Sequence, residues 1–229
     1  MDDGPVNDAT TGTTATTSST VVELDVWAAM RSARATRRFT GRPVDDVLLG
    51  RCLEAATWAP SGGNQQPWRF VVLRSPEARA ALELGAARAL ATIERTYGLT
   101  RPDPVDDSPR ARTDRAMFAL HDGAAAVPAA VLFCVGPQPN VPPLLEGASI
   151  YPAMQNFLLA ARACGLGTCV TGWHVDAEAE LRAAVGVPGP WRLAALIVVG
   201  WPAGRHGPVR RRPVSRVACL DRWDQPLLP

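Results

Sequence analysis

The stretch at residues 59–70 reads Ala59-Pro60-Ser61-Gly62-Gly63-Asn64-Gln65-Gln66-Pro67-Trp68-Arg69-Phe70. It lies between an apolar pattern of helical spacing at 47–58 and a β-type run at 70–73. The two glycines permit positive φ or a close approach of the backbone to a ligand. The serine, asparagine and glutamine side chains supply donors and acceptors able to read the edge of a polar heterocycle. Two interpretations stay open here: a solvated helix-to-strand loop anchored by Trp68, or a ligand-binding loop.

A cluster of arginines precedes this stretch. Residues 21–33 have apolar side chains at helical spacing, and the helix they predict ends near Arg34-Ala35-Thr36-Arg37-Arg38-Phe39. Such a cluster is typical of a solvated helix end, because cations favour a helix C-terminus. Arginines also bind phosphate and carboxylate groups in a bidentate manner.

The elements around the stretch alternate between helical and strand patterns. Asp45 or Asp46 is expected to cap a helix that runs to Trp58. Ser75, followed by a proline, predicts the start of a helix that continues to about Tyr97. Residues 98–109 predict an irregular loop. Further helices are expected at 110–121, 144–164 and 176–185, and buried strands at 129–135, 168–173 and 193–199.

Pro152 is expected to kink the helix at 144–164 or to mark its first turn. Gly165 is expected to end that helix. The glycines of Gly165-Leu166-Gly167 do not indicate a dinucleotide-binding turn, because Val170 stands where the third glycine belongs and a helix precedes them. Helices and strands of this order predict one domain of mixed α and β structure.

Composition excludes several classes of protein. The chain has 229 residues and a net charge of +2, so nothing in its overall charge favours nucleic acid. Its five cysteines are odd in number and form no C-x-x-C pair, which fits a reducing cytoplasm and predicts neither a disulfide framework nor a zinc site. No stretch is apolar for long enough to span a membrane. Residues 1–20 are rich in Thr and Ser and predict a disordered tail.

Four motifs in order resemble the FMN-dependent nitroreductase family. They are the arginine cluster at 34–39, the stretch at 58–70, the run Ala148-Ser149-Ile150-Tyr151-Pro152-Ala153-Met154-Gln155-Asn156 with Gly165-Leu166-Gly167-Thr168, and residues 200–204 with 210–213. The resemblance covers roughly residues 24–224. It implies an α+β fold, a three-layer α/β/α sandwich with a mostly antiparallel sheet, in an intertwined homodimer. Residues 21–229 would form this FMN-binding domain, with residues 204–229 as a C-terminal extension that packs on the partner subunit.

The resemblance also implies which residues bind the cofactor. The N-terminal basic segment would contact the FMN phosphate and the pyrimidine edge of the ring, and it stays open whether Arg37 or Arg38 reaches the ring. The loop at 60–66 would lie against the flavin, with Ser61 serving the cofactor of the partner. The strand after Gly167 would face N5, and the tail would add a phosphate contact. The residues carried over are Arg34, Thr36, Arg37, Arg38, Pro60, Ser61, Gly62, Asn64, Gln66, Val170, Thr171, Gly172, Arg210 and Arg211.

The activity implied is a ping-pong transfer of hydride from NADPH or NADH, through FMN, to nitroaromatic, quinone or similar electron-poor acceptors. No side-chain nucleophile or acid/base pair is expected, because the cofactor carries the chemistry at N5. An alternative is a specialised reaction on the same fold: a dehalogenase, an ene reductase, a natural-product dehydrogenase or a flavin-fragmenting enzyme. A more remote alternative is a non-enzymatic module that binds acidic partners through its arginines.

Overall fold

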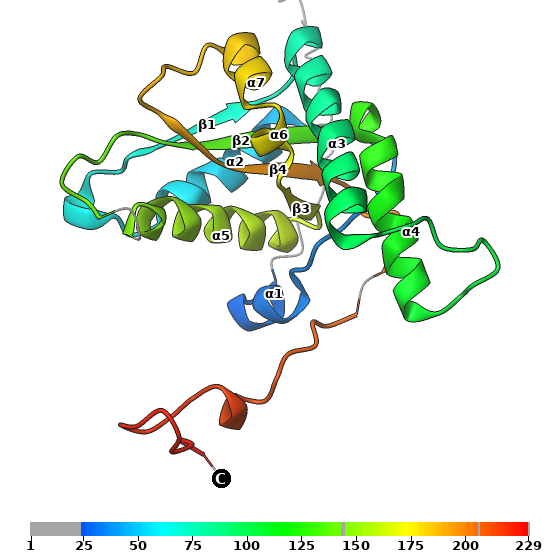
Figure 1. Cartoon of the computed structure of the whole chain (residues 1–229). Helices are drawn as coiled ribbons and strands as arrows, with labels where there is room; N and C mark the ends of the chain where they lie inside the picture. Colours follow the sequence, from blue (N-terminus) through cyan, green and yellow to red (C-terminus); the bar gives the residue numbers. More distant parts are fainter. Residues whose placement is uncertain (1–23, 143–144, 206, 229) are drawn as a thin grey trace, which may run out of the picture.

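The computed structural model describes residues 24–142, 145–205 and 207–228 (Figure 1). The tail predicted at residues 1–20 lies outside the described residues. Within these ranges, seven α-helices and four strands follow one another, with short 3₁₀ turns between some of them. Their bounds are α1 Val26–Ser32, α2 Asp46–Thr57, β1 Trp68–Val72, α3 Pro76–Tyr97, α4 Pro109–Asp122, β2 Ala129–Val135, α5 Gly147–Ala163, β3 Gly167–Thr171, α6 Trp173–Asp176, α7 Glu178–Val185 and β4 Arg192–Gly200.

The four strands form one antiparallel sheet in the order β1-β2-β4-β3. Every residue of β2 is buried, as the continuous apolar run predicts. In β2 and β4, Val135 pairs with Arg192 at one end of the sheet and Ala129 pairs with Val199 at the other. Gly167 of β3 pairs with Gly200 of β4 at this second end. The register therefore fixes which loops meet at each end.

Helices cover both faces of the sheet. The side chains of Val131 and Phe133 face a core shared with α2 and α5. Those of Leu132 and Cys134 face a second core with α3, α4, α6 and α7. This division follows from the alternation of side chains along a strand. The three-layer α/β/α sandwich with an antiparallel sheet is confirmed (Figure 1).

Local sequence explains where the helices begin. The Asp45 carboxylate accepts from the N–H groups of Val47 and Leu48 and so caps α2. Ser75 caps α3 and Ser108 caps α4, each followed by a proline that needs no hydrogen-bond acceptor in the first turn. Pro152 lies inside α5, which begins five residues earlier at Gly147. The helix at 110–121 and the irregular loop before it are confirmed to within a residue or two.

The prediction of a buried strand at 168–173 was wrong at its outer end. The strand β3 stops at Thr171, and Trp173 and His174 belong to the short helix α6, where both are buried. Because β3 is an edge strand, Val170 is 44% exposed. Asp176 lies in α6, so it does not cap the next helix, and α7 begins at Glu178.

The chain leaves the sandwich after β4. Its C-terminal segment passes α1, where the Val209 N–H donates to the Arg31 carbonyl, and leads away from the body of the protein (Figure 1). Large apolar side chains on it are open to solvent, and Trp223 is 96% exposed. No helix among the described residues has the length and apolar character needed to cross a membrane.

Candidate functional site

The segment at 34–40 is held between β3 and the start of the C-terminal segment. The Thr36 N–H donates to the Thr168 carbonyl at 2.7 Å, and the Thr40 N–H donates to the Trp201 carbonyl at 2.8 Å. Thr36 is 3% exposed. A Cβ atom on Gly167 would lie 2.6 Å from the Thr36 hydroxyl oxygen, so a glycine is needed there. The backbone of this segment is thus fixed, and its arginines project from a rigid support.

A large cavity opens on one side of this segment, and we call it the Arg37 cavity. It has a volume of about 730 Å³. The first turns of α4 and the C-terminal segment close it from the other sides. Its lining residues are Arg34, Ala35, Arg37, Pro109, Arg112, Gly207, Pro208, Val209, Arg210 and Arg211. Four of the residues that the resemblance assigns to the cofactor therefore meet here: Arg34, Arg37, Arg210 and Arg211.

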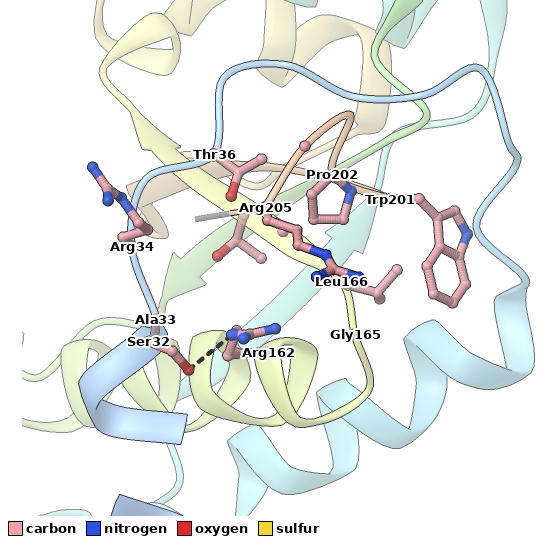
Figure 2. A pocket seen from close by; sticks show the side chains of 13 residues that line it. Ser32, Ala33, Arg34, Thr36, Arg162, Gly165, Leu166, Trp201, Pro202 and Arg205 are labelled. Atoms are coloured by element: carbon pink, nitrogen blue, oxygen red, sulfur yellow. Dashed lines mark hydrogen bonds between the residues drawn. The ribbon is translucent and has the colours of Figure 1, made fainter. Parts of the chain in front are cut away.

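A second cavity opens on the other side of Arg34, and we call it the Arg162 cavity. It has a volume of about 460 Å³ and lies between α1, the end of α5, the start of β3 and the C-terminal segment (Figure 2). The predicted residues Arg34 and Thr36 line it. Arg162 and Arg205 line it as well, although the resemblance assigns neither of them.

Both cavities are strongly electropositive. Among the residues that the structure describes, no carboxylate lines either cavity. Arg112 makes a salt bridge to Asp107 at 3.0 Å, and both side chains are largely exposed. In the described part of the chain, none of the other arginines that line the cavities forms a salt bridge. Unpaired guanidinium groups around a cavity form a site for an anion.

Arg37 and Arg38 differ in their surroundings. Arg37 is half-buried and lines the Arg37 cavity, whereas Arg38 is exposed and lines neither cavity. Burial lowers the pKa of His121, and the positive charge of Arg37 lowers it further. Burial raises the pKa of Cys169, and the same arginine opposes that rise. Arg37 therefore lies near His121 of α4 and near Cys169 of β3.

The outer end of β3 presents a surface for a flat ligand. Val170 is exposed, Thr171 is half-buried, and the Thr171 hydroxyl donates to the Leu196 carbonyl at 3.2 Å. A Cβ atom on Gly172 would meet nothing within 4 Å. These three predicted residues adjoin the segment at 34–40, because Ala35 bridges to Thr168 on the same strand.

The loop at 60–66 is ordered by its own polar groups. Gly63, Asn64 and Gln66 have φ of 57°, 53° and 49°. The Ser61 hydroxyl accepts from the Gln66 N–H at 3.0 Å, and the Asn64 side-chain oxygen accepts from the Gln66 side-chain amide at 3.2 Å. Two residues other than glycine in the left-handed region indicate stored backbone strain, which is typical of ligand-binding loops.

The structure does not bring this loop together with the arginines of the same chain. The loop leads into Trp68, which pairs with Val135, and the Gly136 N–H donates to the Pro67 carbonyl. The arginine segment lies at the opposite end of the sheet, beside Gly167 and Gly200. At about 3.3 Å per residue along β4, these ends are separated by roughly 25 Å. One chain therefore holds two halves of a site, which we call the loop end and the arginine end.

The buried thiols of Cys52 and Cys134 lie outside both cavities. Burial and the neighbouring Cys164 thiol raise the pKa of Cys52 to about 12, and burial raises that of Cys134 to about 11. Both thiols therefore stay protonated and are poor nucleophiles at neutral pH. Across the described ranges, no three His, Cys, Asp or Glu residues lie together as a metal site.

Several known proteins are similar to this chain in sequence and in fold. A model of the nitroreductase family matches residues 30–201. An NADH dehydrogenase of Thermus thermophilus is 32% identical over 203 residues, which are 87% of this chain and 97% of that protein. A 5,6-dimethylbenzimidazole synthase of Rhodospirillum rubrum is 30% identical over 182 residues, 76% of this chain and 80% of the synthase. The solved structure of an FMN and NADPH-dependent nitroreductase of Sphigopyxis sp. strain HMH superposes with a TM-score of 0.66 at 26% identity, covering 87% of this chain and 100% of that one.

Proposed function

This chain belongs to the nitroreductase family, and from that premise we propose that it is an FMN-dependent oxidoreductase that works as a homodimer. NADPH or NADH donates hydride, and a nitroaromatic, quinone or similar electron-poor compound accepts it in a separate half-reaction. The observation that carries the proposal is the Arg37 cavity, which gathers Arg34, Arg37, Arg210 and Arg211 next to the segment that bridges to β3 at Thr168.

The Arg37 cavity fits the phosphate of FMN. A phosphate monoester carries about −1.5 to −2 charges near neutral pH and has three strong acceptor oxygens. The guanidinium groups around the cavity offer several charge-assisted donors, and among them only Arg112 has a carboxylate partner in the described part of the chain, Asp107. Arg112 of α4 adds a donor that the resemblance did not assign. We assign the phosphate to this cavity for these reasons.

The flavin ring is assigned to the outer face of β3. When bound, FMN supplies the hydride chemistry, so the protein has to bind and orient the ring and stabilise charge on it. Val170 offers an apolar contact, and Gly172 leaves the ring room to approach the backbone. Arg37 is half-buried and lines the neighbouring Arg37 cavity, and its fixed positive charge would stabilise negative charge at the pyrimidine edge.

A second copy of the chain is assigned to complete the site. The loop end carries Pro60, Ser61, Gly62, Asn64 and Gln66, and it lies too far from the arginine end of its own chain to touch the same cofactor. A twofold axis would place the loop end of each chain against the arginine end of the other. Exposed apolar side chains support an interface of this kind: Trp27 and Met30 on α1, and Val214, Val217, Leu220 and Trp223 on the C-terminal segment.

Spectroscopy of the purified protein tests this proposal. We expect a yellow dimer with one FMN per chain, an absorbance band near ~450 nm, and anaerobic bleaching by NADPH or NADH. Restoration of the band by a nitroaromatic or a quinone would complete the cycle. A colourless monomer that takes up no FMN would overturn the proposal.

The similarity to the 5,6-dimethylbenzimidazole synthase favours one further candidate, a flavin-consuming reaction. The two activities differ in the fate of FMN during turnover. With NADPH and oxygen present but no other acceptor, an acceptor reductase keeps its flavin intact. A flavin-consuming enzyme loses it in proportion to turnover, which chromatography of the released flavin would measure.

A further inference from the structure

Two cavities provide more positive charge than one phosphate needs. Arg37, Arg210 and Arg211 line the first, Arg162 and Arg205 line the second, and Arg34 stands between them. None of these six arginines forms a salt bridge to a described residue. FMN brings a single phosphate with about two negative charges, and that group is assigned to the first cavity. The phosphate of FMN therefore leaves Arg162 and Arg205 of the Arg162 cavity without an assigned anionic ligand.

The Arg162 cavity has the form of a built anion site. The Arg162 Nε–H donates to the Ser32 hydroxyl at 2.9 Å, which ties the last turn of α5 to the last turn of α1 and orients the guanidinium group. Figure 2 shows the side chains of Arg162 and Arg205 reaching into the same space from α5 and from the C-terminal segment. A preorientated guanidinium group loses less side-chain entropy when it binds a ligand.

The Arg162 cavity also has apolar lining residues beside its arginines. Trp201 and Pro202 line it, and both are half-buried. The guanidinium group of Arg42 lies 3.9 Å from the centre of the Trp201 ring, and the Trp201 indole N–H donates to the Pro43 carbonyl. The indole is thus held in place by Arg42 and Pro43. A cavity lined by arginines together with an aromatic side chain suits an adenosine phosphate better than a small inorganic anion.

We propose that the Arg162 cavity binds the 2′-phosphate of NADPH, so that NADPH is the preferred hydride donor. The proposal rests on the proposed function, because this chain needs a nicotinamide donor only if it acts as a flavin reductase. NADPH and NADH share their pyrophosphate, and they differ only in the 2′-phosphate, a monoester with about two negative charges. Arg162 and Arg205 would bind this group, and Trp201 with Pro202 would contact the adenosine.

Anaerobic stopped-flow reduction of the holoenzyme tests the proposal. We expect NADPH to bind at least about 10-fold more tightly than NADH, as charged hydrogen bonds to one phosphate predict. Arg162→Gln and Arg205→Gln should each remove most of that preference by weakening NADPH binding, with NADH kinetics and FMN content unchanged. Arg51→Gln serves as the matched control, because Arg51 is exposed on α2 and lines neither cavity.

Calorimetric titration with 2′,5′-ADP and 5′-ADP gives a second readout that does not depend on turnover. The cavity should favour 2′,5′-ADP, and Arg162→Gln should abolish the difference while the thermal midpoint stays within a few degrees of the parent.

Three results would overturn the assignment. Equal loss of NADPH and NADH binding would place the pyrophosphate at these arginines, and loss of FMN would place the flavin phosphate there. Equal binding of the two ADP isomers by the parent protein would show that no 2′-phosphate site exists. If the parent protein takes up no FMN, the proposed function is contradicted instead. The ADP titration would still show whether the Arg162 cavity binds a 2′-phosphate.

Discussion

The loop end and the arginine end of the sheet are built from opposite kinds of residue. The arginine end gathers positively charged side chains on a backbone that hydrogen bonds fix to β3 and the C-terminal segment. The loop end has uncharged polar side chains on a strained backbone, in which Gly63, Asn64 and Gln66 lie in the left-handed region. One end suits a phosphate and the other suits the polar edge of a ring. The difference indicates that each end provides half of a site, and that two chains are needed to bind one cofactor.

The largest effect should come from blocking the loop end. Gly62→Trp adds a large side chain where a Cβ atom would meet nothing within 4 Å in its own chain. The fold should therefore tolerate the change, while the indole fills the space assigned to the cofactor of the partner. We expect FMN content to fall by more than about 10-fold with little change in thermal stability. Gly50→Trp is the control, since Gly50 is equally open and lies on α2. Normal FMN content in Gly62→Trp would show that the loop at 60–66 does not contact FMN.

A smaller effect should follow from displacing the arginine segment. Gly167→Ala forces a Cβ atom against Thr36, which is buried and has its backbone bonded to Thr168. Overpacking of this kind costs about 1–3 kcal/mol of stability. FMN affinity should fall as well, because the segment that carries Arg34 and Arg37 must shift. Gly172→Ala at the other end of β3 has open space and should cost less than half as much in urea denaturation. Equal costs would show that the close contact does not matter.

Arg37 and Arg38 should differ when each is changed to glutamine. Arg37 lines the cavity assigned to FMN, so Arg37→Gln should weaken FMN binding by ~1.5–3 kcal/mol, the range for a hydrogen bond to a charged group. Arg38 is exposed, so Arg38→Gln should weaken binding by less than about 1 kcal/mol. Fluorescence titration of the apoprotein with FMN measures both. The reverse order would assign the ring contact to Arg38.

Acidification should destabilise the fold through two histidines beside the site. Burial lowers the pKa of His121 and of His174 below the ordinary value near 6.5. The unfolded chain then binds more protons than the folded one, so the stability that these neutral rings provide is present above about pH 6.5 and is lost as the pH falls through their lowered values. The urea midpoint should fall between pH 7.5 and pH 5, and His174→Asn should lessen that fall. If the urea midpoint of His174→Asn depends on pH as strongly as that of the parent, His174 does not contribute to the acid destabilisation.

The smallest effect should come from the cysteines. Cys164 lies beside Cys52 at the end of α5 and lines neither cavity. Cys164→Ser should leave FMN content and turnover within about twofold of the parent and change stability by about 1 kcal/mol or less. A loss of turnover without loss of fold would give this thiol a chemical role.

The sequence was enough to predict most of the fold, because its signals were local. Asp45 and Ser75 cap helices that begin where the sequence predicts, and the apolar run at 129–135 is β2. The end of β3 was predicted wrongly. Trp173 and His174 are buried in the short helix α6, and a buried strand would have placed them in the core as well. Nothing in the local pattern distinguishes those two outcomes.

The site was only partly accessible to the same reasoning. The arginines at 34–38 and 210–211 stood out as clusters, and the structure gathers most of them around one cavity. Arg112 and Arg162 lie singly on helices that carry other surface charges, so composition gave no reason to select them. Their role depends on which helix ends meet beside Arg34, and that is a property of the tertiary structure. The separation of the two ends likewise follows from the strand register and not from any motif.

A mixed dimer tests the shared site most directly. One chain would carry Arg37→Glu and Arg211→Glu at the arginine end, and the other would carry Gly62→Trp at the loop end, with different affinity tags to purify the heterodimer. Each homodimer has two damaged sites and should hold no FMN. If two chains share each site, the heterodimer has one site with both defects and one intact site, so it should bind one FMN per dimer and be reduced by NADPH. A heterodimer without FMN would contradict the account, because it would show that each chain binds its cofactor alone.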